Sequence, residues 1–62
     1  MKGPFYIFQL CKEAALGDVY RGARDGETDA CVEALRLRDR YGQGTYVLDA
    51  WGNKVEGYPK IA

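Results

Sequence analysis

Apolar residues recur every three or four positions in the middle of this chain, which is the period of an α-helix. Between positions 29 and 41 they stand at Ala30, Ala34, Leu37 and Tyr41. At about 100° per residue, these four side chains form one stripe. The pattern therefore predicts an amphipathic helix whose stripe faces a hydrophobic core.

The residues that flank this segment predict where the helix begins and ends. Thr28 is a suitable N-cap, because its hydroxyl can accept a hydrogen bond from a backbone amide of the first turn. Asp29 follows it, where the positive end of the helix dipole favours a carboxylate. Gly42 comes directly after Tyr41 and can adopt the left-handed conformation that commonly ends a helix. We expect the helix to span residues 29–41.

Four other segments are rich in β-branched and aromatic residues and are predicted to be strands. They are residues 5–11, 19–23, 45–51 and 54–58. Gly52 and Asn53 separate the last two, a pair typical of a two-residue hairpin turn. Residues 12–18 are expected to form a helical turn or a wide connection. The sequence thus predicts a single α+β domain over residues 1–62. In it, an antiparallel sheet of three or four strands packs on the helix in the order β-β-α-β-β.

A two-residue turn determines which side chains of the hairpin share a face. In that register Asp49 opposes Glu56, and Val47 opposes Tyr58. Four side chains then face the core: Tyr46, Leu48, Ala50 and Val55. Four share the exposed face: Asp49, Trp51, Glu56 and Tyr58. Tyrosine and tryptophan are enriched in protein interfaces, so this exposed face is the predicted site for a protein partner. The charged helix face with Arg36 and Arg40 is the second candidate.

Charge and hydropathy exclude several classes of partner. Nine basic and nine acidic residues give a net charge of zero, so no overall field attracts the protein to nucleic acid or to an anionic membrane. The longest apolar run, residues 5–8, is far shorter than the roughly 20 residues that span a bilayer. No signal-peptide core follows the first residues. We expect a cytoplasmic protein that is a monomer or a small homo-oligomer.

The residue types that the chain lacks argue against catalysis. It contains no histidine and no serine, which excludes Ser-His-Asp and Cys-His sites and the common zinc ligand sets. As an alternative, the carboxylates of Asp49 and Glu56 would suit acid–base chemistry or a hard cation, but so small a domain has little room for a cleft. We expect no enzymatic activity, metal or cofactor. Cys11 and Cys31 are expected to be free thiols, and a disulfide is the alternative if their Cα atoms lie within about 7 Å.

Nucleic-acid binding is the alternative function. Exposed aromatic side chains stack on bases and arginines contact phosphates, and the chain has both. The aromatic candidates are Tyr6, Tyr20, Trp51 and Tyr58, and the arginines are Arg21, Arg24, Arg36, Arg38 and Arg40. The carboxylates of Asp49 and Glu56 beside Trp51 would repel phosphate, which favours a protein partner.

In its size and in the order of its elements over residues 5–58, the chain resembles the small proteins that phages make to disable host machinery. Anti-CRISPR proteins and phage inhibitors of bacterial RNA polymerase are examples. The resemblance implies a stoichiometric inhibitor that masks a surface on a host nucleic-acid-processing complex, which is a protein or a ribonucleoprotein. It rests on no motif, so it assigns no role to any residue. The zero net charge departs from the strongly acidic members of this group that mimic DNA.

Overall fold

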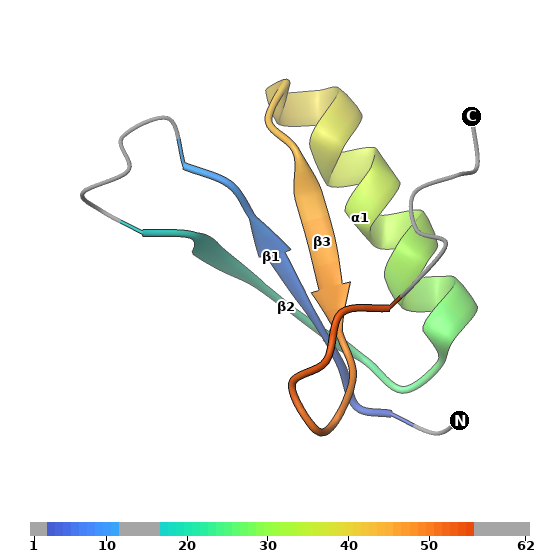
Figure 1. Ribbon diagram of the computed structural model, residues 1–62. Coiled ribbons are helices and arrows are strands. Elements are labelled where there is room, and N and C mark those ends of the chain that lie inside the picture. The colour runs from blue at the N-terminus through green and yellow to red at the C-terminus, as the bar shows by residue number, and fades with distance from the viewer. Residues whose placement is uncertain (1–2, 12–16, 56–62) are drawn as a thin grey trace.

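The computed structural model describes residues 3–11 and 17–55, which form a three-stranded antiparallel sheet and one helix. The strands are β1 (Phe5–Gln9), β2 (Val19–Arg24) and β3 (Thr45–Leu48), and the helix is α1 (Glu27–Tyr41). β1 is the central strand, with β2 on one side and β3 on the other. α1 lies along one face of the sheet (Figure 1). The predicted α+β class is therefore confirmed.

The predicted fourth strand is reduced, in the described part of the chain, to one isolated bridge. Lys54 pairs with Leu48, and the amide of Val55 donates to the carbonyl of Val47 at 2.9 Å. Residues 56–58, the rest of that predicted strand, lie outside the described residues, as do residues 12–16 of the predicted connection. The order β-β-α-β is confirmed, and a last strand remains a prediction.

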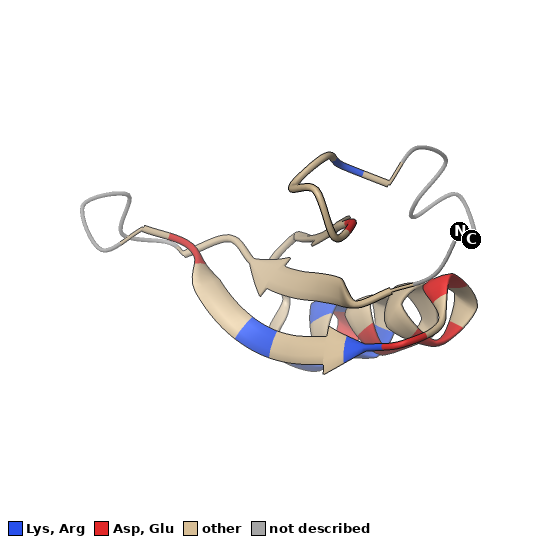
Figure 2. Cartoon of the chain, turned by 90° about the horizontal axis from the view of Figure 1, so that it is seen from below, with Lys and Arg blue, Asp and Glu red and all other residues tan. Residues whose placement is uncertain are grey.

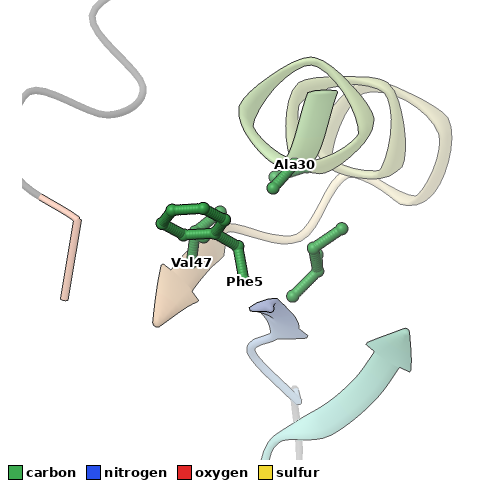
Figure 3. Close-up of a cluster of buried hydrophobic side chains, with 5 residues drawn as sticks. Phe5, Ala30 and Val47 are labelled. Atoms are coloured by element: carbon green, nitrogen blue, oxygen red, sulfur yellow. The ribbon is translucent and has the colours of Figure 1, made fainter. Parts of the chain in front are cut away.

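The hydrophobic core lies between α1 and the sheet. Its buried apolar side chains are Phe5, Ile7, Ala30, Ala34 and Val47 (Figure 3). The two alanines leave the face of α1 flat, so the helix can pack closely against β1 and β3. Leu37 packs on this cluster, as the predicted stripe requires. The stripe is wrong only at Tyr41, which is 47% exposed.

The helix begins earlier than predicted and ends where predicted. Gly26 is the N-cap, in an extended conformation and with no side-chain cap, so the prediction that Thr28 caps the helix is wrong. The reason is the short connection from β2, which leaves only Asp25 and Gly26 before the first helical residue. At the other end Gly42 adopts φ 70°, and its amide donates to the carbonyl of Arg38 at 2.8 Å. The left-handed glycine at this end is confirmed.

β2 contains a bulge that the sequence did not reveal. Ile7 pairs with Gly22 and Phe8 pairs with Tyr20, so Arg21 is an extra residue without a partner on β1. Gly22 adopts φ 121°, a conformation that favours glycine. The bulge turns Arg21 to the side of the sheet that carries α1, where its guanidinium lies 4.5 Å from the centroid of the Tyr41 ring.

Gln9 joins the end of β1 to the end of the helix. Its side chain is 2% exposed. The amide nitrogen donates to the carbonyls of Leu37 at 3.1 Å and Gln43 at 3.3 Å, and the amide oxygen accepts from Nε of Arg21 at 2.8 Å. A buried amide left without such partners would be costly. These three bonds therefore explain how a polar residue stands on the core face of the central strand.

The turn after β3 is longer than the predicted two-residue turn. The amide of Asp49 donates to the carbonyl of Asn53 at 2.8 Å, and the amide of Gly52 donates to the carbonyl of Asp49 at 3.0 Å. Gly52 has a positive φ of 86° in this turn, and Asn53 belongs to the second arm because its carbonyl accepts the amide of Asp49. The loop is therefore residues 50–52. Lys54 opposes Leu48 instead of Trp51, a shift of three residues from the predicted register.

Candidate protein-binding surface

Trp51 stands at the tip of the turn after β3 and is 72% exposed. Its predicted exposure is therefore correct. The turn that carries it lies at the end of the domain where β3 leaves the sheet (Figure 1). An indole so exposed offers a large, rigid apolar surface for contact with another molecule.

Asp49 holds this turn in place instead of facing solvent. It is 7% exposed. Its Oδ1 accepts hydrogen bonds from the amides of Trp51 and Asn53, each at 2.9 Å. The predicted exposed position of Asp49 is wrong, and so is its pairing with Glu56. This carboxylate satisfies backbone amides of its own turn, which limits what it can offer to a partner.

The predicted faces of β3 are inverted for a simple reason. Phe5, Ile7 and Gln9 face the helix, and antiparallel pairing sets Val47 opposite Ile7 on that same side. Alternation along β3 then puts Tyr46 and Leu48 on the other side of the sheet. The sequence pattern of β3 alone does not decide between the two faces, because apolar residues stand at consecutive positions.

Two of the predicted partner-binding residues belong to the helix and two others lie beyond the described chain. Arg36 is exposed and its guanidinium lies 3.8 Å from the carboxylate of Glu33, the predicted i, i+3 pair. Arg40 lies over the ring of Tyr41, 5.6 Å from its centroid. Both are near the end of α1 that precedes β3, whereas Trp51 is at the far end of β3. The structure therefore does not bring these arginines to the turn. Glu56 and Tyr58 lie outside the described residues.

The face of the sheet opposite α1 carries a cluster of aromatic side chains, which we call the aromatic face: Tyr6, Phe8, Tyr20 and Tyr46. The Phe8 ring stacks on Tyr46 with centroids 5.5 Å apart, and lies 5.5 Å from Tyr20. Tyr6 and Tyr20 are 6.5 Å apart. The sequence analysis missed this cluster. Its signal was the aromatic residues at alternate positions 6 and 8, flanked by core residues at 5, 7 and 9.

Two charged groups flank Tyr46 on the aromatic face. Its hydroxyl donates to Oδ2 of Asp18 at 2.6 Å, and Nζ of Lys54 lies 5.1 Å from its ring centroid. The hydrogen bond to Asp18, with burial as a smaller cause, raises the pKa of Tyr46. The phenol therefore stays neutral at physiological pH and keeps this bond.

Most charged residues of the described chain belong to β2 and α1 (Figure 2). On β2, Arg24 reaches across to Glu33 of the helix, with 3.9 Å between their charged groups, and Arg21 turns toward Tyr41. On the helix, Arg38 lies 3.6 Å from Asp39. Arginines and the aromatic face thus occupy opposite sides of the sheet. The combination that nucleic-acid binding was expected to use is not assembled by the described residues.

Neither cysteine forms a disulfide. Cys11 and Cys31 are free, as expected, and each is partly buried. Burial and the nearby Glu27 carboxylate raise the pKa of Cys31, so its thiol stays protonated and is a poor nucleophile.

Residues 3–11 and 17–55 contain no group of three side chains suited to hold a metal ion. In the same residues, no helix is long and apolar enough to cross a membrane. Comparison with protein-family models, with curated proteins and with solved structures found no match to this chain.

Proposed function

We propose that this chain is a non-catalytic protein-binding module that anchors a partner protein through Trp51. The proposal rests on Trp51, whose side chain is exposed while its backbone is held in a fixed turn. Trp51 is 72% exposed, yet its backbone is held by the carboxylate of Asp49 at 2.9 Å. A side chain presented on a fixed turn loses little entropy on binding, and tryptophan is among the residues most enriched at interface hot spots.

The resemblance to small phage proteins narrows this proposal. The partner would be a host nucleic-acid-processing complex, and the module would inhibit it by occupying a surface in a one-to-one ratio. Such a mode of action needs neither a catalytic group nor a cofactor. It needs only an anchor and a complementary rim, for which Glu56 and Tyr58 remain the predicted candidates.

Nucleic-acid binding receives less support from the arrangement of the charged groups. Phosphates require several cations beside the stacking rings. Lys54 is the cation that contacts a ring of the aromatic face in the described chain, and Arg21 and Arg24 turn to the opposite side. We therefore prefer protein binding to nucleic-acid binding as the function of this chain.

The first experiment is affinity capture from a bacterial lysate, with and without nuclease, followed by titration of the purified partner. A protein that stays bound after nuclease treatment is the expected result. Loss of every bound component on nuclease treatment, together with binding that weakens steeply with salt, would replace the proposal with the nucleic-acid alternative.

The second experiment assigns the anchor. Trp51→Ala is expected to weaken binding of that partner by at least about 2 kcal/mol, roughly 30-fold in Kd, with an unchanged thermal midpoint. Val32→Ala, at a 39% exposed apolar position on α1, is the matched control and should bind normally. Glu56→Lys tests the predicted rim. Normal binding by Trp51→Ala would move the site away from the turn, and Arg36 and Arg40 would become the next candidates.

A further inference from the structure

We propose that the aromatic face is the contact surface of a symmetric, face-to-face dimer of this chain. The proposal concerns a surface separate from the Trp51 turn and does not depend on the function proposed above. It starts from an imbalance between the two faces of the sheet. The face under α1 buries one aromatic side chain, Phe5, and packs it on two alanines, whereas the other face carries the four rings defined above.

These rings contact one another, and three of them, Tyr6, Phe8 and Tyr46, are only partly buried. Phe8 contacts Tyr20 and Tyr46 across both neighbouring strands, so the rings form a continuous row over the sheet. At one edge Tyr20 is 56% exposed, and Leu10, which continues the alternation of β1 on the same side, is 47% exposed. Exposed apolar patches of this kind commonly mark an interface. A second copy gains most, because it buries an identical face at the same time.

The charges on the aromatic face are complementary to those of a second copy. Asp18 lies at the hydroxyl of Tyr46, and Lys54 lies over the ring of the same residue. Neither Asp18 nor Lys54 forms an ion pair within the described chain. One anion and one cation thus contact the same tyrosine, and neither has an oppositely charged partner in the described part of the molecule.

One two-fold axis satisfies both charges at once. The axis lies in the plane between the two sheets, perpendicular to the line from Asp18 to Lys54, and passes over the midpoint of that line. Rotation about it places Asp18 of each copy against Lys54 of the other, which gives two equivalent ion pairs. Both charged groups contact Tyr46, so the axis passes near this residue and brings the Tyr46 rings of the two copies toward each other. This is the self-complementary pairing that a two-fold interface requires.

The size of the face sets the expected strength. Three strands about 4.8 Å apart, with about five residues of 3.3 Å each, give a face of roughly 250 Å² in projection. Stable interfaces usually remove about 800 Å² of accessible surface from each partner. The dimer is therefore at the weak end of specific association and dissociates on dilution.

The test is a charge-reversal exchange measured by sedimentation equilibrium over a range of concentrations. The wild-type chain is expected to shift with rising concentration from its monomer mass of 6.9 kDa to twice that mass. Asp18→Lys and Lys54→Asp should each remain monomeric, because each places like charges together at both contacts. An equimolar mixture of the two variants should recover the dimer, since every pair across the axis is then opposite in sign. The double variant should recover it alone.

Two controls separate this contact from a folding effect or from another surface. Far-UV circular dichroism must show each variant folded. Asp39→Lys, at a side chain that is 76% exposed on α1, should leave the dimer unchanged. A wild-type chain that stays monomeric at millimolar concentration would overturn the proposal. So would a dimer that survives both single reversals, or two monomeric variants whose mixture does not associate.

Discussion

Replacing Asp49 by alanine is expected to lower the free energy of unfolding by about 2–3 kcal/mol. One carboxylate oxygen accepts the amides of Trp51 and Asn53, both at 2.9 Å, and a hydrogen bond to a charged group contributes about 1.5–3 kcal/mol. The sum of two such bonds is reduced because Trp51 and Asn53 are exposed, so water reaches the freed amides. A domain of this length is typically stable by about 3–9 kcal/mol. The substitution should therefore remove a large part of the total.

The assay compares three variants by urea denaturation followed with far-UV circular dichroism. Asp49→Asn keeps an acceptor oxygen without its charge and should cost about 1 kcal/mol, the value of a neutral hydrogen bond. Asp39→Ala removes an exposed carboxylate whose surface ion pair contributes about 0–1 kcal/mol. Hydrogen exchange of the Trp51 and Asn53 amides reports the turn itself. Unchanged exchange at these amides, or an Asp49→Ala midpoint equal to that of Asp39→Ala, would refute the reasoning.

Three further predictions concern the core, the pH dependence and the helix end. Ile7→Ala should lower the free energy of unfolding, measured by urea denaturation, by about 2–5 kcal/mol. Leu37→Ala should lower it less, because Ile7 is fully buried and Leu37 only partly. The reverse order would contradict the described core. In the folded chain, the hydrogen bond to Asp18 raises the pKa of Tyr46. The neutral phenol therefore stabilises the fold below about pH 10, the pKa of a free tyrosine. This stabilisation is lost as the pH rises through the raised pKa of Tyr46. Tyr46→Phe should flatten that alkaline loss in a stability profile, and an identical profile would exclude the cause. Gly42→Ala places a side chain at φ 70° and should cost about 1–2 kcal/mol in thermal denaturation, whereas an unchanged midpoint would show that the helix ends differently.

The helix was predictable because its signals are local and repeated. The period of the apolar positions involves four residues of one segment, and Ala30 and Ala34 lie buried as the period requires. Gly42 ends the helix through its own backbone conformation. The prediction of Thr28 as the N-cap was wrong although its side chain suits that position. The short connection from β2 makes Gly26 the N-cap instead.

The hairpin and the aromatic face depend on interactions between distant residues, which a single segment does not contain. Gly52 and Asn53 are typical of a two-residue turn, but the carboxylate of Asp49 stabilises a longer one by accepting two amides. When the pairing shifts by an odd number of residues, the side chains of the two arms change face relative to each other. Tyr46 and Leu48 therefore leave the predicted core face, whereas Val55 keeps it and packs on the core. The exposure of Trp51 was predicted correctly because the tip of a loop is exposed in either register.

The bulge at Arg21 bears on how copies of this chain can associate without aggregating. β2 is an edge strand of the sheet in the described chain, and an edge strand of regular geometry offers its unpaired amides and carbonyls to any neighbouring strand. The extra residue and the φ of 121° at Gly22 break the regular spacing of those groups halfway along β2. Another copy therefore finds no uninterrupted edge on β2 to which it could add its own strand. Open-ended growth through this edge is disfavoured, which favours association through surfaces that close on themselves.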